Sequence, residues 1–285
     1  MLSASRDPVN RQQIPLTGIP PIDYDVLPSQ SFRDFPEENI PLMEAVGVIP
    51  ARYGSVRFPG KVLADLQGMP LVQHVYERAR KAGSLGRLVV ATDDERILQV
   101  VQDFGGEAVL TSREHSSGTD RLAEVAVSLP AALYVNIQGD EPLLEARDID
   151  SLVESIREDP SLEMATLRRP IEDEADFLNP NVVKVVVDGA GNALYFSRSP
   201  IPFLRQGGRT SAHRHIGLYA YRRQLLLEIA ACPVGNLEKT EQLEQLRVLE
   251  MGRCIRVLDA VGNSIGVDTP EDLERVRTIL GKSVR

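Results

Sequence analysis

A basic loop near residue 50 combines residue types that bind phosphate. The stretch VIPARYGSVRFPGK, residues 48–61, carries three cations and two glycines: Arg52, Arg57, Lys61, Gly54 and Gly60. Glycines let backbone amides approach an anion closely, and arginine and lysine donate charge-assisted hydrogen bonds to phosphate oxygens. The spacing differs from the GxxxxGK[ST] loop, because five residues separate the two glycines and valine follows the lysine. The loop indicates a phosphate site of another kind, and a solvated connection with incidental cations is the alternative that its composition leaves open.

Two acidic stretches indicate a site for a divalent cation. NIQGDEP, residues 136–142, places Asp140 and Glu141 after a predicted buried strand, and GVDTPED, residues 266–272, places Asp268 at the end of another short predicted strand. Ligands of α/β proteins collect at the carboxyl ends of strands. Two carboxylates suit Mg²⁺ when phosphates complete its coordination. Each aspartate also suits the N-cap of a following helix, so both interpretations stay open.

The elements that would position these residues alternate from Val46 onward. Strands are predicted over 46–50, 87–92, 107–110 and 133–138. Between them we expect one helix from Pro70 to a stop at Gly83, one capped by Asp93 and ending at Phe104, and one with an apolar stripe over 122–129. This alternation predicts βαβ units in a mainly parallel sheet that is flanked by helices.

The second half of the chain has another pattern. Residues 182–197 contain two strand-like runs joined by a glycine-rich turn, which predicts a hairpin. Further strands are predicted over 217–222 and 254–260, with helices around 239–251 and over 269–280. We therefore expect one α/β domain over residues 45–285 with a smaller hairpin-bearing subdomain. Residues 1–44 read as an extended or disordered tail, and Met43 is a candidate for the natural start.

Bulk properties restrict the class of function. The chain has 285 residues, 42% of them apolar, and a net charge of −9. The apolar content indicates a globular protein, and the negative charge disfavours binding to long nucleic acid. There is no apolar run long enough to cross a bilayer and no secretory signal pattern, so we expect a cytoplasmic protein without a membrane partner.

Nine segments in register resemble one enzyme family. They are IPARYGSVRFPGKVL, VATDD, HSSGTDRLAEV, NIQGDEP, NPNVVKVV, ALYFSRSPIPF, RHIGLYAYR, LEQLRVLEMG and GVDTPEDLERVR, in order through residues 46–280. Together they are similar to the 3-deoxy-manno-octulosonate cytidylyltransferases, also called CMP-Kdo synthetases. The first half is shared more loosely with other sugar-nucleotide transferases, so the resemblance depends on the second half.

The resemblance implies a reaction and an assembly. The fold would be nucleotide-diphospho-sugar transferase-like, with the dimerisation and sugar-binding part of a homodimer roughly over residues 180–250. The activity would be Mg²⁺-dependent transfer of CMP from CTP to the anomeric hydroxyl of Kdo, with release of pyrophosphate, for lipopolysaccharide biosynthesis. The alternatives are the same transfer to 8-amino-Kdo or to a sialic acid, and a nucleotide-binding regulator without turnover.

The same resemblance implies roles for individual residues. The nucleotide would be held by Arg52, Arg57, Lys61 and Arg121. The metal would be held by Asp140 and Asp268, which would form the catalytic group with Arg57 and Lys61. The sugar acid would contact Gln138, His215, Tyr219, Glu244 and Gln245. Without the resemblance, the last four of these have ordinary structural interpretations, as strand residues or as the solvent side of a helix.

Overall fold

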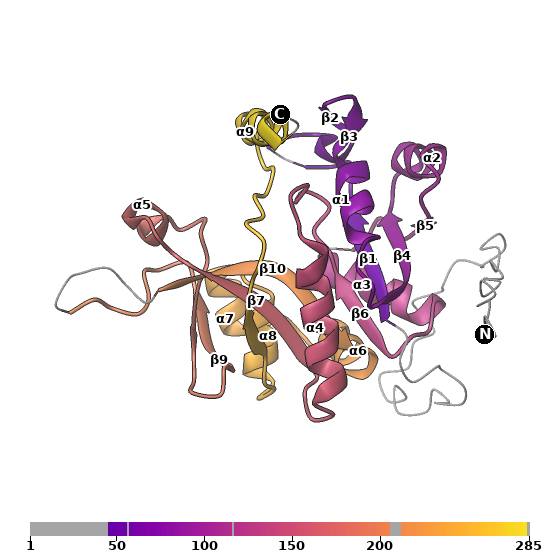
Figure 1. Cartoon of the computed structure of the whole chain (residues 1–285). Coiled ribbons are helices and arrows are strands. Elements are labelled where there is room, and N and C mark those ends of the chain that lie inside the picture. Colours follow the sequence, from indigo (N-terminus) through magenta and orange to yellow (C-terminus); the bar gives the residue numbers. More distant parts are fainter. Residues whose placement is uncertain (1–44, 56, 116, 206–211, 284–285) are drawn as a thin grey trace, which may run out of the picture. The chain divides into compact units, whose positions relative to one another are not determined.

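The computed structural model describes residues 45–283, apart from residues 56, 116 and 206–211 (Figure 1). The predicted tail over residues 1–44, including Met43, lies outside the described residues.

A nine-stranded mixed sheet forms the centre of the described chain, in the order β11-β7-β10-β6-β1-β4-β5, with β8 beside β10 and β9 beside β8. Its strands are β1 Ala45–Ala51, β4 Leu85–Thr92, β5 Ala108–Leu110, β6 Leu133–Asn136, β7 Met164–Pro170, β8 Lys184–Val187, β9 Ala193–Ser197, β10 His213–Arg222 and β11 Arg256–Asp259. Strand β1 pairs in parallel with β4 and β6, and β11 pairs in parallel with β7. Strand β10 runs antiparallel to both β6 and β7. The predicted α/β fold with a mainly parallel sheet and a hairpin is confirmed, while β7 was not predicted.

Helices cover both faces of this sheet (Figure 1). One face packs against α1 Leu71–Ala79, α2 Glu95–Asp103 and α4 Ala146–Glu158. The other face packs against α3 Gly118–Ser128, α6 Arg223–Ala231 and α8 Gln245–Glu250. Along β1, Val46 and Val48 enter the second core, whereas Ile49 and Ala51 enter the first. Burial on both faces explains the continuous apolar run of this strand.

Smaller elements complete the described chain. They are the 3₁₀ helix η2 Lys61–Leu63, the short hairpin β2 Asp65–Leu66 and β3 Met69–Pro70, and the helices α5 Glu174–Leu178, α7 Asn236–Glu241 and α9 Pro270–Ser283. Helix α9 lies beside β2 and β3 (Figure 1), where Leu273 and Val276 share a core cluster with Leu66. None of the described helices is long and apolar enough to cross a membrane.

Two predicted helix ends were wrong. Helix α2 is capped by Asp94, whose carboxylate accepts from the amide of Arg96, because β4 extends to residue 92 and the carboxylate of Asp93 is paired elsewhere. Helix α1 ends at Ala79 rather than at Gly83. The chain leaves α1 through successive tight turns over residues 80–82, which need no left-handed glycine.

Two predictions in the second half were also wrong. The helix expected around 239–251 is divided into α7 and α8, because Gln242 has the left-handed φ of 54° and reverses the chain between them. Asp268 does not follow a strand, since residues 261–269 form no regular element. That segment is attached at its start by the amides of Val261 and Gly262, which donate to the carboxylate of Asp148, and near its end by a hydrogen bond of 2.9 Å from the amide of Val267 to the carbonyl of Asp140.

Candidate active site

The basic loop and the two acidic segments meet at Lys61. Its Nζ lies 2.5 Å from Oδ2 of Asp140 and 3.0 Å from Oδ1 of Asp268. The other oxygen of Asp268, Oδ2, lies 3.0 Å from Nη2 of Arg57. Four predicted residues from three distant segments therefore form one charged cluster.

Two glycines allow the backbone to form this cluster. Gly60 has a φ of 70° and its amide donates to the carbonyl of Tyr53, which ends the loop directly before Lys61. Gly139 lies where the chain leaving β6 crosses the end of β1. A Cβ added there would lie 2.9 Å from the carbonyl oxygen of Pro50. A larger residue at position 139 would therefore displace Asp140.

Neither aspartate caps a helix. The N-cap of α4 is Glu145, which makes no side-chain capping bond. At α9 the capping partners are Thr269 and Asp272: the amide of Thr269 donates to Asp272 Oδ2 at 3.0 Å, and the amide of Asp272 donates to Thr269 Oγ1 at 3.3 Å. The structure thus excludes the capping alternative for the carboxylates of Asp140 and Asp268.

Electrostatics keep Lys61 and Asp268 ionised. Burial disfavours the charge on Lys61, but the neighbouring carboxylates of Asp140 and Asp268 outweigh burial and raise the pKa of the ammonium group. Burial likewise acts to raise the pKa of Asp268, but Lys61 and Arg57 outweigh it and the pKa is lowered. A positive centre is therefore stable between the two carboxylates at neutral pH.

The donor set fits a divalent cation that keeps open positions. Both carboxylates already converge on one cationic nitrogen. Within the described residues there is no group of three or more acidic, histidine or cysteine side chains that could hold a metal ion. A cation bound here would take two protein carboxylates and leave its other positions to phosphate oxygens and water, which matches the preference of Mg²⁺.

A cleft of about 490 Å³ opens beside these carboxylates. Its lining includes seven of the predicted site residues: Gln138, Asp140, His215, Tyr219, Glu244, Gln245 and Asp268. They come from the end of β6, from β10, from the start of α8 and from the segment before α9. The fold therefore brings together residues whose proximity the sequence alone could not establish.

A bulge in β10 shapes one wall of the cleft. The register of β10 against β7 shifts between residues 216 and 219, and the buried hydroxyl of Thr166 lies 3.0 Å from Nε2 of His215. From the other side, Nε2 of Gln138 donates to the carbonyl of Gly217 at 3.0 Å. Bulges re-aim side chains in this way near many active sites.

Two aromatic side chains of this wall, His215 and Tyr219, are uncharged. Burial lowers the pKa of His215 to about 3, so its imidazole is neutral at physiological pH. Burial raises the pKa of Tyr219, whose ring centroid is 5.3 Å from that of His215. Both residues therefore offer hydrogen bonds rather than charge to a ligand.

Glu244 and Gln245 form the opposite wall at the start of α8. Oε2 of Glu244 accepts a hydrogen bond of 2.6 Å from Oγ1 of Thr119, and burial raises the pKa of Glu244. Behind them, the guanidinium of Arg247 donates two hydrogen bonds of 2.6 Å to the carboxylate of Glu238. This buried pair joins α7 to α8 and turns residues 244 and 245 toward the cleft instead of toward solvent.

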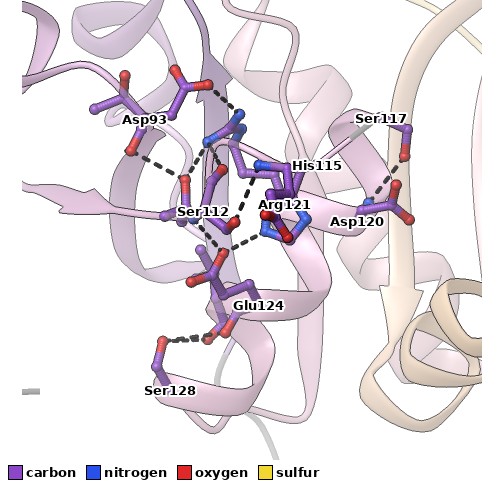
Figure 2. A network of polar contacts seen from close by, with 12 residues as sticks. Asp93, Ser112, His115, Ser117, Asp120, Arg121, Glu124 and Ser128 are labelled. Atoms are coloured by element: carbon purple, nitrogen blue, oxygen red, sulfur yellow. Dashed lines mark hydrogen bonds and ion pairs between the residues drawn. The ribbon is translucent and has the colours of Figure 1, made fainter. Parts of the chain in front are cut away.

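None of the four predicted nucleotide residues is among the cleft lining, and Arg52 and Arg121 also lie outside the charged cluster of Arg57 and Lys61. Arg52 is exposed in the basic loop. Arg121 is only 3% exposed and its Nη2 lies 3.1 Å from Oδ2 of Asp93. Figure 2 shows this guanidinium pointing toward Asp93 and Ser112 within a polar network at the start of α3. Arg121 thus supports the segment that leads into α3, whose residues 118 and 119 line the cleft.

Sequence analysis missed two buried polar residues of the cleft, Asn136 and Tyr221. Asn136 is two residues before Gln138, and Tyr221 is two residues after Tyr219. Since side chains alternate along a strand, residues two apart share a face. This periodicity could have identified both of them.

Comparisons with known proteins identify the family of this chain. A family model described as "Cytidylyltransferase" matches residues 46–255. The 3-deoxy-manno-octulosonate cytidylyltransferase of Geobacter sulfurreducens is 53% identical over 245 residues, which cover 82% of this chain and 98% of the relative. That of Syntrophobacter fumaroxidans is 54% identical over 245 residues, with 84% and 98% covered. The chain belongs to the 3-deoxy-manno-octulosonate cytidylyltransferase family.

Solved structures support the assignment to the cytidylyltransferases. A structure described as CMP:2-keto-3-deoxy-manno-octonic acid synthetase complexed with CTP is 47% identical, has a TM-score of 0.81, and is matched over 84% of this chain and 99% of that chain. A 4-diphosphocytidyl-2C-methyl-D-erythritol synthase from Anaerococcus prevotii, 12% identical with a TM-score of 0.58 over 84% of this chain and 98% of that chain, shares the fold alone. The predicted family and fold are confirmed, and the protein is a nucleotidyltransferase.

Proposed function

We propose that this cytidylyltransferase transfers CMP from CTP to the anomeric hydroxyl of 3-deoxy-D-manno-octulosonate (Kdo), with release of pyrophosphate, for lipopolysaccharide biosynthesis. The observation that carries the proposal is the convergence of Asp140 and Asp268 on Lys61, at a cleft lined by all five predicted sugar-binding residues. A phosphate-binding cluster beside a hydroxyl-binding cleft suits the joining of a nucleotide and a sugar.

The basic residues of the loop would bind the triphosphate. Arg52 and Arg57 are exposed and Lys61 lies between the two carboxylates, so these three side chains would donate to an anionic polyphosphate bound beside the acidic cluster. Nucleophilic displacement at phosphorus depends mainly on in-line positioning and charge neutralisation. We assign both tasks to these three cations.

Asp140 and Asp268 would hold Mg²⁺. When bound, this ion would neutralise charge on the triphosphate and lower the pKa of the attacking hydroxyl. The chain's own contribution is to keep the two carboxylates adjacent, through the ion pairs with Lys61 and Arg57.

The cleft residues would orient the sugar acid. Gln138, His215, Tyr219, Glu244 and Gln245 offer neutral donors and acceptors together with one carboxylate, which suits a polyhydroxylated ligand. Because Asp140 and Asp268 line the same cleft, a sugar acid bound there would have its anomeric hydroxyl within reach of the acidic cluster. Fixing that hydroxyl against the α-phosphate supplies the orientation part of the rate enhancement.

We further propose that the enzyme acts in the cytoplasm as a homodimer that assembles through the part over residues 180–250. Exposed apolar side chains on this part support an interface: Leu194, Phe203, Val234 and Leu237. Sedimentation analysis at micromolar concentration should give about twice the mass of the chain. A monomer under assay conditions would refute the proposed assembly.

The test of the activity follows both products. The purified enzyme is incubated with CTP, Mg²⁺ and Kdo, and pyrophosphate release is followed together with the mass of the sugar nucleotide. We expect one pyrophosphate per CMP-Kdo formed, and no product when chelator is present. Faster turnover of 8-amino-Kdo or of a sialic acid would replace the proposed substrate, and CTP binding without turnover of any of these acids would refute transferase activity.

A further inference from the structure

One acceptor in the wall of the cleft has no partner. Asn136 is 4% exposed on β6, and its Oδ1 makes no hydrogen bond with the described residues. Leaving a buried acceptor unpaired costs free energy, so such atoms call for an explanation.

The position of Asn136 places this acceptor on the sugar side of the cleft. On the sheet, Asn136 is paired directly with Tyr219 of β10. Gln138, two residues later, lines the same cleft. Both neighbours belong to the residues that the proposed function assigns to the sugar acid.

The surroundings of Oδ1 favour a ligand that donates hydrogen bonds. The hydroxyl of Thr119 already donates to Glu244 Oε2 at 2.6 Å. Glu244 itself contributes acceptor oxygens, and Asn136 adds one more acceptor to the same lining. A wall that is rich in acceptors is complementary to the hydroxyl groups of a polyol.

We propose that Oδ1 of Asn136 accepts a hydrogen bond from a hydroxyl group of the bound sugar acid and so contributes to the selection of that substrate. This inference rests on the proposed function, because it concerns the same cleft. It adds a specificity residue that the motif comparison did not identify. A buried polar group that is paired only by the correct substrate discriminates strongly against analogues that lack the donor.

The first experiment removes the acceptor with little change in volume. Asn136→Leu should lower kcat/KM for Kdo about tenfold or more, while the KM for CTP stays within about twofold. The matched control is Ser84→Ala, because Ser84 Oγ is also buried and unpaired but lies outside the cleft lining. Ser84→Ala should leave both kinetic constants unchanged. A raised KM for CTP in Asn136→Leu, or an unchanged kcat/KM for Kdo, would overturn the proposal.

The second experiment identifies the hydroxyl and does not depend on how well one variant folds. Kdo analogues that each lack a single hydroxyl are compared in the unsubstituted enzyme and in Asn136→Leu, or in Asn136→Ala if the leucine variant does not fold. One analogue should lose about tenfold in kcat/KM with the unsubstituted enzyme and show no further loss with the variant. If the losses are the same in both proteins, Asn136 does not contact the sugar.

The proposed activity and the proposed role of Asn136 can be refuted independently of each other. Absence of Kdo turnover in the unsubstituted enzyme would refute the proposed function. Normal Kdo turnover that is insensitive to substitution of Asn136 would refute this inference alone.

Discussion

Removing Arg247 should destabilise the wall of the cleft that carries Glu244 and Gln245. The side chains of Arg247 and Glu238 are 8% and 9% exposed, and two hydrogen bonds of 2.6 Å join them. Arg247 also donates to the carbonyl of Ile229 at 2.9 Å. Arg247→Met leaves the Glu238 carboxylate buried without its partner, which costs about 3–5 kcal/mol in comparable cases. Thermal unfolding should move down by roughly 10 °C, and the KM for Kdo should rise more than that for CTP.

A surface pair provides the control for this prediction. Arg80 and Glu77 are joined at 3.2 Å, but their side chains are 60% and 36% exposed. Arg80→Met should cost at most about 1 kcal/mol, because water screens the pair. Adding Glu238→Gln to Arg247→Met should recover part of the loss, since it removes the isolated charge. If Arg247→Met and Arg80→Met are equally mild in urea unfolding, the argument from burial is wrong.

Three further substitutions test the site. Asp140→Asn should reduce kcat about 100-fold or more, while CTP binding measured by calorimetry is retained. The control Asp259→Asn, in an exposed pair with Arg168, should have no effect on kcat. Equal activities of the two variants would show that Asp140 has no role in catalysis. Gly139→Ala should lower both kcat and stability, because the added Cβ would lie 2.9 Å from the carbonyl oxygen of Pro50. The control Gly189→Ala should be neutral, since a Cβ there would have no atom within 4 Å. A fully active Gly139→Ala variant would show that the close approach of the two backbones is not required. Burial lowers the pKa of His215 to about 3 in the folded protein, compared with 6.5 in the unfolded chain. The contribution of the neutral, buried imidazole to the free energy of unfolding is therefore fully present above pH 6.5 and is lost as the pH falls from 6.5 toward 3. Stability should therefore fall by about 1.4 kcal/mol per pH unit in this window, and His215→Gln should flatten that slope in urea unfolding at pH 6, 5 and 4; parallel slopes would refute it.

Local sequence patterns predicted most strands of the sheet, because each of these strands has a recognisable apolar run or is bounded by a recognisable turn. The apolar run of β1 and the glycine-rich turn between β8 and β9 are visible without any knowledge of partners. Strand β7 was not predicted, because its last three residues, Arg168, Arg169 and Pro170, interrupt the apolar pattern expected of a strand. What these segments touch depends on contacts between distant parts of the chain, which a local pattern does not contain.

The candidate site illustrates the same limit. Asp140 and Asp268 were each recognisable, but helix capping remained an alternative until Thr269 and Asp272 were seen to cap α9 together. The hydrogen bond from Val267 to Asp140 brings the two segments together over more than a hundred residues of chain. The unpaired oxygen of Asn136 is a property of three-dimensional packing alone.

The strands of the central sheet and the last residue of the charged cluster come from successive parts of the chain. Every strand of the central sheet precedes residue 260, whereas Asp268 follows the last of them. The polypeptide up to residue 260 therefore contains every strand of the sheet but only one of the two carboxylates. A chain cut after β11 and before Asp268 should keep every strand of the sheet and lose one carboxylate of the proposed metal site, so we expect this truncated product to be inactive even when its sheet forms.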